Sequence, residues 1–504
     1  MSAISLTASF SRPTGYAAAG DTIPFLQDDT YHLFQLSSPP DTLYHPPRVR
    51  CTWTRQRSQD LIQWKRDEMP VISPGQAKTD FDSDGSWTGS AVLGPDGHMH
   101  IFYTGYNLLE NGKQVILHAK STDRQGTQFT KPEAPICIES GSLEQYEATD
   151  FRDPYVFFHE PESQYWMLVA TRLAKGPYWT RGCVALLTSK DLKAWTVASQ
   201  PLHSPNNIFC PECPELFTLG NGKWYLLYSR FSAPHPGTLY MIADNPRGPF
   251  HLPRDCSGGV IDGRRWYAAK SCARAGDPSK RIAFGWVHDY VEADSKWLWG
   301  GSTTQPREYS ARMDGTLQCS VLPEIEKRLQ EAGTMFNDHS KQLILNGPGT
   351  TVAKAVSTPQ CDFYLTFALP KAEANSFGLM LDYDDDMRGY RISFQHVASQ
   401  YYSVTLVCDM PPFDDFWADL TSHSIPKLVD GPELVRHGAV RLDQPMTLIR
   451  SGDIIEFFVG GKVITYRLPQ RSKTSAKMKN SVGLFVEDGE IEFNLLRCVP
   501  VRYL

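Results

Sequence analysis

The first 300 residues repeat one strand pattern five times, and this repeat constrains the fold more than any other feature. Short aromatic and apolar segments begin at Tyr31, His100, Tyr165, Trp224 and Arg281, about 57 to 69 residues apart. Turn sequences rich in Gly, Pro, Asp and Asn separate them. Five repeats with about four short strands each predict a five-bladed β-propeller.

A second motif comes after most of these segments in the same order. A polar stretch closes on an aromatic residue at Trp64, Phe129, Trp195 and Phe250. Unrelated strands of a β-sandwich would not be expected to repeat two motifs in the same order. The same region contains no convincing long amphipathic helix. The propeller interpretation is therefore preferred to a set of sandwich strands.

The period ends after Arg307, and the rest of the chain has a different organisation. A short helix is predicted at 322–333, where helical apolar spacing ends at a glycine. From about Lys341 the chain is again strand-like, and its alternation suits a β-sandwich. We predict an all-β protein with a propeller over 1–320, a linker with a short helix over 321–340 and a sandwich over 341–504.

Composition gives no indication of a nucleic-acid or membrane partner. A formal charge of −6 over 504 residues does not suggest a surface for nucleic acid or an anionic membrane. Nothing approaches ~18 uninterrupted apolar residues, and the N-terminus lacks the pattern of a signal peptide. Eleven cysteines without regular spacing suggest reduced thiols, so we expect a cytoplasmic protein.

Three carboxylates occupy equivalent places in the repeat. Asp21, Asp153 and Glu212 each begin an innermost strand, in blades 1, 3 and 4 of the predicted propeller. Innermost strands line a central channel, so these side chains should meet at one end of it. A buried unpaired carboxylate is costly, which favours a shared function over a structural one. Paired carboxylates are the groups that cleave glycosidic bonds.

Local sequence suggests different roles for these acids. Glu212 is flanked by cysteines and prolines, and burial among them would raise its pKa and suit a general acid. Arg152 would favour the ionised form of Asp153 if both point into the pocket. A purely structural ion pair between Arg152 and Asp153 remains the alternative.

The chain resembles glycoside hydrolase family 32, the β-fructofuranosidases, within a clan shared with the arabinan-cleaving family 43. The resemblance covers about 480 residues, including the C-terminal half. Its motifs are R-D-P at 152–154, E-C-P at 212–214, a G-x-F-S-G-S-like segment at 85–90 and a W-x-x-x-x-S-x-D-L-x-x-W stretch at 53–64.

This resemblance implies a retaining enzyme that releases terminal β-D-fructofuranosyl groups from a small carbohydrate substrate, without a cofactor or metal. Asp21 would be the nucleophile, Asp153 the transition-state stabiliser and Glu212 the acid/base. The sugar subsite would be lined by Trp53, Trp87, Thr88 and Arg152. A homodimer formed through the sandwich is compatible with the resemblance.

One departure from the family is large. The usual W-M-N-D-P-N-G around the nucleophile is replaced by A-G-D-T-I-P-F at 19–25. Asp28 or Asp29 as nucleophile is disfavoured, because both fall where a turn should be. The missing Asn and Trp would contact the fructosyl ring and the group linked to it. Sucrose is therefore not assured as the substrate, and another furanoside remains open.

Three alternative functions are compatible with the same residues. A family 43-like arabinofuranosidase, inverting if its acids lie ~6.5–9.5 Å apart, is the second enzyme hypothesis. Transfer of fructosyl to another sugar would use the same groups as hydrolysis. A sugar-binding propeller without catalysis is the third hypothesis, motivated by the altered segment around Asp21.

Four other features carry weaker signals. Cys210 and Cys213 have metal-ligand spacing, but one pair without a second is a poor zinc site. Glu215 is a rival for the general acid. The acidic stretch at 382–386 is better interpreted as a solvated hairpin end than as a calcium site. The aromatics at 413–417 suit either an interface or a substrate wall.

Overall fold

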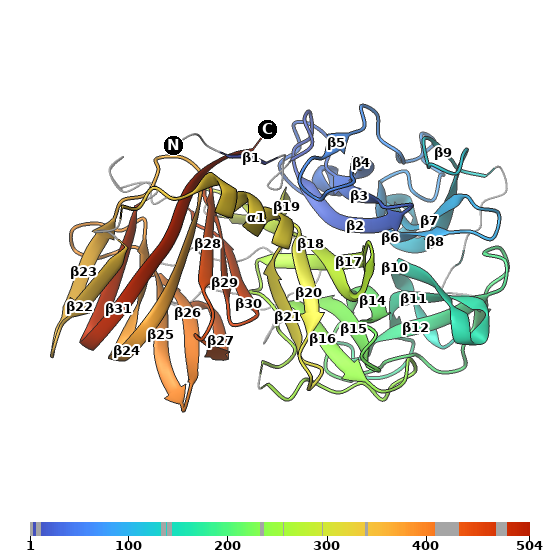
Figure 1. Cartoon of the computed structure of the whole chain (residues 1–504). Coiled ribbons are helices and arrows are strands. Elements are labelled where there is room, and N and C mark those ends of the chain that lie inside the picture. Colours follow the sequence, from blue (N-terminus) through green and yellow to red (C-terminus); the bar gives the residue numbers. More distant parts are fainter. Residues whose placement is uncertain are drawn as a thin grey trace.

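The structure is a computed structural model that describes most of the chain. The described residues are 4–6, 12–132, 138, 144–231, 236–255, 257–294, 296–337, 341–408, 433–469 and 481–503. Two β-rich bodies lie side by side, with the helix α1 (Pro323–Ala332) between them (Figure 1). The predicted all-β fold, a propeller followed by a sandwich, is confirmed.

The propeller has five blades in chain order. Blade 1 contains β2 (Ala19–Gln27), β3 (Thr30–Ser37), β4 (Thr52–Ser58) and β5 (Lys65–Arg66). Blade 2 contains β6 (Gly85–Leu93), β7 (Met99–Asn107), β8 (Lys113–Ser121) and β9 (Phe129–Thr130). Blade 3 contains β10 (Tyr146–His159), β11 (Gln164–Leu173), β12 (Gly182–Ser189) and β13 (Thr196–Val197). Blade 4 contains β14 (Glu212–Thr218), β15 (Trp224–Arg230) and β16 (Gly237–Ala243). Blade 5 contains β17 (Trp266–Arg274), β18 (Asp277–Val291), β19 (Lys296–Thr303), β20 (Arg307–Ala311) and β21 (Leu317–Val321).

The repeat seen in the sequence comes from strands that are covered on both faces. Every residue of β7 is buried, as are eight of the ten in β11, because neighbouring blades cover these central strands. Such strands carry nearly continuous apolar runs instead of alternating ones. The second marker is a turn. Asp60 and Asp191 each accept two backbone N–H groups after the third strand of their blade.

The ring closes between the first and last blades. The innermost strands β2, β6, β10, β14 and β17 each contact the next around the ring, and β17 contacts β2. In addition β19 pairs with β2 through Gly301 and Ala19. The starts of all five inner strands are therefore held around one axis.

The described residues after α1 form ten strands of the sandwich. They are β22 (Gln342–Asn346), β23 (Thr351–Val356), β24 (Phe363–Leu381), β25 (Tyr390–Ala398), β26 (Tyr401–Cys408), β27 (Glu433–Arg441), β28 (Met446–Ser451), β29 (Ile454–Val459), β30 (Lys462–Arg467) and β31 (Val482–Tyr503). The long strands β24 and β31 pair along most of their lengths, and β24 also pairs with β25 at one end and with β28 at the other. Buried aromatic and aliphatic side chains fill the space between the layers.

The N-terminal strand β1 (Ile4–Leu6) pairs in parallel with β31. We expected residues 1–320 to form the propeller, but these three residues extend the sandwich sheet instead. A three-residue strand carries too little pattern to be assigned from sequence.

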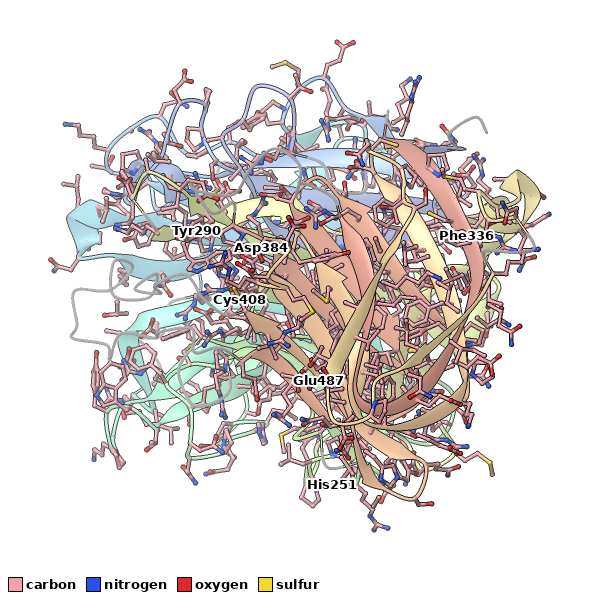
Figure 2. The ribbon with its side chains drawn as sticks, turned by 90° about the vertical axis from the view of Figure 1, so that its left-hand side faces the viewer. His251, Tyr290, Phe336, Asp384, Cys408 and Glu487 are labelled. Atoms are coloured by element: carbon pink, nitrogen blue, oxygen red, sulfur yellow. The ribbon has the colours of Figure 1, made fainter. Side chains whose placement is uncertain are left out.

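The acidic stretch at 382–386 lies at the end of a hairpin on the sandwich, where Asp384 is labelled in Figure 2. Asp384 and Asp386 both accept from Arg388, and Asp382 pairs with Arg450. The aromatic insertion at 413–417 lies outside the described residues. No helix in the described part of the chain has the length and apolar run of a membrane span.

A buried ion cluster joins the two domains. Arg307 on β20 donates to Asp262 at 2.6 Å and to Glu456 on β29, and all three side chains are almost completely inaccessible. Burial raises the pKa of Glu456, while Arg307 opposes that rise. The arginine therefore supplies the opposite charge that the described residues provide for these two buried carboxylates.

We expect Arg307→Met to lower the free energy of unfolding by about 3–5 kcal/mol, because it leaves buried carboxylates uncompensated. Urea unfolding followed by tryptophan fluorescence measures this loss. The matched control is Arg388→Met, which removes an exposed arginine paired with Asp386 and should change stability by less than about 1 kcal/mol. Equal losses in both variants would contradict a special role for the cluster.

Candidate active site

All five inner strands change register at the same level of the propeller. The shifts fall between residues 19 and 22, 87 and 89, 152 and 155, 212 and 215, and 267 and 270. Register shifts of this β-bulge kind turn side chains away from the regular pleat. Asp153, Cys213 and Ala268 have positive φ values of 58°, 52° and 49° at these points. The bulges therefore direct side chains from five blades into one space.

That space is a cavity of about 450 Å³. Asp21, Asp153 and Glu212 all line it, as the sequence predicted they would share a site. Trp87, Thr88 and Arg152 line it as well. The cavity thus unites strands β2, β6, β10 and β14.

Asp21 is buried and surrounded by neutral donors. Thr88 Oγ1 donates to Asp21 Oδ2, and Trp286 Nε1 donates to Oδ1 at 2.7 Å. Burial raises the pKa of Asp21 to about 6, and the nearby charge of Asp153 adds to the rise. The hydrogen bonds from Thr88, Trp286 and Cys213 limit it. Asp21 is consequently ionised above about pH 6 and protonated below.

Cys213 connects two of the acids. Its backbone N–H donates to Asp153 Oδ2 at 2.8 Å, and its Sγ lies 3.5 Å from Asp21 Oδ2. The backbone N–H of Asp153 in turn donates to Thr104 Oγ1 at 2.8 Å. One residue of the E-C-P motif therefore holds the carboxylates of blades 1 and 3 against each other.

Glu212 has two polar partners and a partly exposed side chain. Arg152 Nη2 donates to Oε1 at 2.7 Å, and Tyr267 Oη donates to Oε2. Burial raises the pKa of Glu212 and the charge of Asp153 adds to it, while Arg152 and Tyr267 oppose the rise. A carboxyl with a raised pKa retains its proton to higher pH, as a general acid requires.

Arg152 is a shared clamp for several acids. Besides Glu212, it donates to Asp150 Oδ1 at 2.7 Å, and its Nε lies 3.9 Å from Asp153 Oδ2. The simple Arg152–Asp153 ion pair considered from sequence is thus the longest of three contacts. Asp150 also pairs with Arg172, which extends the charged wall of the cavity.

The predicted sugar-subsite residues divide into two groups. Trp87 lies in the cavity wall, stacked on Tyr106 with ring centroids 4.0 Å apart. Trp53 does not reach the cavity, which corrects the prediction that it lines the sugar subsite. It is completely buried, and its Nε1 donates to the backbone carbonyl of Trp87 at 3.1 Å. Trp53 supports the cavity wall at Trp87 from behind, because β4 is the third strand of blade 1 and lies farther from the channel than the innermost strand β2.

The rival acids lie elsewhere. Asp28 and Asp29 occupy the β2–β3 turn with positive φ values, and Asp28 is exposed. Glu215 is fully buried outside the cavity and accepts from Ser271 and Arg281. A register shift in β14 separates Glu212 from Glu215, and of the two only Glu212 is among the residues that line the cavity.

The thiols of Cys210 and Cys213 contact different groups. Cys210 Sγ faces the carbonyl of Thr171 at 3.9 Å, whereas Cys213 Sγ faces Asp21. In the described part of the chain, no group of three or more His, Cys, Asp or Glu residues is arranged to hold a metal ion.

Blade 5 supplies site residues that the sequence did not reveal. Tyr267 and Trp299 line the cavity, and Trp286 contacts Asp21 from behind. Trp286 belongs to the repeated segment that begins at Arg281, but the repeat alone marks it only as core. Their positions depend on closure of the ring, which brings residue 286 beside residue 21.

The family model for the glycosyl hydrolases family 32 N-terminal domain matches residues 19–319, about three fifths of the chain. The chain belongs to glycoside hydrolase family 32. The resemblance inferred from the motifs is thereby confirmed.

Two curated relatives illustrate the similarity of this family 32 protein. It is 27% identical to the insoluble β-fructofuranosidase isoenzyme CWINV2 of Arabidopsis thaliana, over 56% of the chain and 49% of that protein. It is 25% identical to a fructan 6-exohydrolase of Beta vulgaris, over 69% of the chain and 59% of that protein. The chain thus matches about half to three fifths of the length of these relatives.

Solved structures share the fold over nearly the whole family 32 chain. Fructan 1-exohydrolase IIa of Cichorium intybus has a TM-score of 0.71 at 18% identity, covering 99% of this chain and 98% of its own. Exo-inulinase of Aspergillus awamori has a TM-score of 0.68 at 17% identity, covering 97% and 98%. At these identities the likeness establishes the fold.

We expect Asp21→Asn to stabilise the protein at neutral pH. Folding raises the pKa of Asp21 from 3.8 to about 6, so the folded state loses stability as the pH rises between these values. At ~1.4 kcal/mol per pKa unit, the loss above pH 6 is about 2–3 kcal/mol. The variant should therefore gain that amount at pH 7.5 and nothing below about pH 4.

Urea unfolding at pH 7.5 and at pH 4 measures this difference. Asp386→Asn, at the exposed hairpin end, is the control and should show no such pH-dependent gain. An equal gain for Asp21→Asn at both pH values would mean that burial of its charge is not the cause.

Proposed function

We propose that this protein hydrolyses terminal β-D-fructofuranosyl linkages of sucrose, fructo-oligosaccharides or fructans with retention of configuration. The observation that carries the proposal is one cavity containing a buried carboxyl with a pKa of about 6 and a glutamate whose pKa is also raised. The relatives named above are β-fructofuranosidases and fructan exohydrolases. A Bombyx mori family member has been solved in complex with sucrose.

The proposed reaction has two steps. Asp21, ionised near neutral pH, attacks the anomeric carbon while Glu212 donates its proton to the departing oxygen. This forms a covalent fructosyl-enzyme ester. Glu212 then removes a proton from water, which attacks the anomeric carbon and releases Asp21. Two displacements return the original anomeric configuration.

Different environments support the two roles. Asp21 receives three neutral hydrogen bonds, which favour its anion without neutralising it by an ion pair. Glu212 lies beside Arg152 and Tyr267, which steady its carboxylate after the proton has left. Asp153, oriented by Cys213, is proposed to hold sugar hydroxyls and stabilise the positive charge that develops on the ring.

The compartment is part of the proposal. Cys51, Cys183 and Cys272 are buried free thiols, which suits a reducing environment. We therefore propose a cytoplasmic enzyme.

The proposal predicts that the protein releases free fructose from sucrose, short inulin or levan oligosaccharides. The anomeric carbon of the newly released fructose should have the same configuration as in the substrate. Product chromatography and NMR of the nascent anomer measure both. Glu212→Gln should lower kcat by roughly 10²–10⁴-fold, the usual contribution of a positioned proton donor. Glu215→Gln keeps the same chemical change outside the cavity and serves as the control, with folding checked by thermal unfolding.

Other products separate the alternative functions. Arabinose from an aryl arabinofuranoside without fructose release would favour the furanosidase alternative. Longer oligosaccharides at high sucrose would indicate fructosyl transfer. Sugar binding without any turnover would indicate a non-catalytic propeller. Either this result or arabinose release without fructose release would contradict the proposal.

The pH profile of kcat/KM should fall on the acidic side near pH 6, because protonated Asp21 cannot attack. Thr88→Val removes a hydrogen-bond donor that favours the Asp21 anion. The midpoint of the acidic fall in kcat/KM should therefore move to a higher pH by about one unit. Thr366→Val on the sandwich is the control and should leave the profile unchanged. A limb unaffected by Thr88→Val would assign it to another group.

A further inference from the structure

Two adjacent aromatic side chains stay exposed at the edge of the cavity. The segment 174–181 joins β11 to β12 in blade 3 and carries Tyr178 and Trp179. These residues are 37% and 42% exposed. Apolar surface left in water forgoes the free energy that its burial would give, and contiguous surface of this kind marks a binding site. Exposure of the two rings is therefore expected if they contact a ligand.

Arg172 holds these rings in place. Its Nη2 donates to the backbone carbonyl of Tyr178 at 2.7 Å, and its guanidinium lies 4.3 Å from the centre of the Tyr178 ring. The same guanidinium lies 4.0 Å from the centre of the Phe209 ring. Trp179 packs against both rings, with centroids 5.2 Å apart in each case. Tyr178, Trp179 and Phe209 thus form one fixed surface, the aromatic platform.

Charged groups accompany the aromatic platform. Glu147 pairs with Arg172 at 3.0 Å and with Arg181 at 2.6 Å. Asp150 pairs with Arg172 at 3.2 Å. Glu147, Asp150 and Arg172 line the cavity together with two rings of the platform. A sugar offers hydroxyls to such acceptors and donors and C–H faces to aromatic rings, so the combination suits a sugar.

The platform lies on the side of the cavity that holds the proposed general acid. Phe209 precedes Glu212 by three residues, and both line the cavity. Asp150, the partner of Arg172, also accepts from Arg152 at 2.7 Å, and Arg152 donates to Glu212 at 2.7 Å. Because Glu212 protonates the departing oxygen in the proposed reaction, the leaving group must lie on the same side as Glu212.

We infer that the aromatic platform binds the leaving-group sugar of the proposed reaction, with a C–H face of that sugar against Tyr178 and Trp179. Glu147 and Asp150 accept from its hydroxyl groups. The platform thereby selects among fructosides by the group that is released, without contacting the fructosyl group. The inference rests on the proposed function, since reaction at Glu212 is what places a leaving group here.

The test compares two substrates that share the fructosyl group and differ in the leaving group. One is the sucrose, inulin or levan saccharide that the wild-type protein hydrolyses fastest, and the other is methyl β-D-fructofuranoside, which releases methanol. Trp179→Ala should lower kcat/KM for the saccharide about tenfold, because the apolar contact is lost. For the methyl fructoside it should stay within about twofold of wild type.

Two further variants complete this comparison. Trp179→Phe keeps an aromatic face and should lie within about threefold of wild type on the saccharide. Phe158→Ala is the matched control, because Phe158 also belongs to blade 3 and is 41% exposed, yet is not among the residues that line the cavity. It should match wild type on both substrates.

A binding measurement gives an independent readout. Titration calorimetry in the Glu212→Gln background, where turnover is slow, compares the protein with and without Trp179→Ala. The Kd of the saccharide should rise about tenfold, whereas the Kd of methyl β-D-fructofuranoside should stay within about twofold. A merely structural role of Trp179 would weaken both ligands alike.

The outcomes distinguish the two claims, with thermal unfolding confirming that each variant folds. An active wild type whose Trp179→Ala variant loses activity equally on both substrates, or on neither, overturns the inference and leaves the proposed function standing. A wild type that releases no fructose from any fructoside overturns the proposed function, and the assignment of the platform to a leaving group falls with it.

Discussion

The site depends on one backbone constraint, the register shift that each inner strand makes at the same level of the ring. A regular pleat would send alternate side chains into the blades on either side. The shifts at Asp153 and Cys213 instead require positive φ values, a conformation that non-glycine residues adopt only at a cost. Closure of the ring and packing between blades hold the strands in that conformation. In return, side chains from five separate blades converge on one cavity.

Convergence creates the electrostatic properties of the site. Asp21, Asp153 and Glu212 would repel one another if all were ionised, and burial removes the water that would screen them. Arg152 neutralises part of this charge, and Cys213 separates and orients two of the acids with one thiol and one backbone N–H. Stability is therefore lost at Asp21, while two carboxyl groups with raised pKa values are kept in one cavity. The cost is acceptable because the large cores of the blades and the sandwich surround the cavity.

Blade 5 is where the two domains and the cavity meet. Its strand β20 carries Arg307, which binds a carboxylate of the sandwich, while β18 and β19 carry Trp286 and Trp299 toward β2. The sandwich thus holds the blade that completes the cavity wall. The last blade also supplies the ring of Trp299, which lies against Gly20, the residue before Asp21.

The class of fold and the three acids could be predicted from the amino-acid sequence. Strands buried on both faces must be apolar, so the period of the propeller was visible, and Asp21, Asp153 and Glu212 stood at equivalent points of that period. The neighbours of these acids, in contrast, are set by the assembled ring. Trp286 lies 265 positions from Asp21 along the chain, and nothing in either local sequence specifies that contact. The position of Trp299 beside residue 20 and the attachment of β1 to the sandwich arise in the same way. The local sequence pattern predicts which side chains are buried. The contacts across the closed ring depend instead on how the last blade packs against the first.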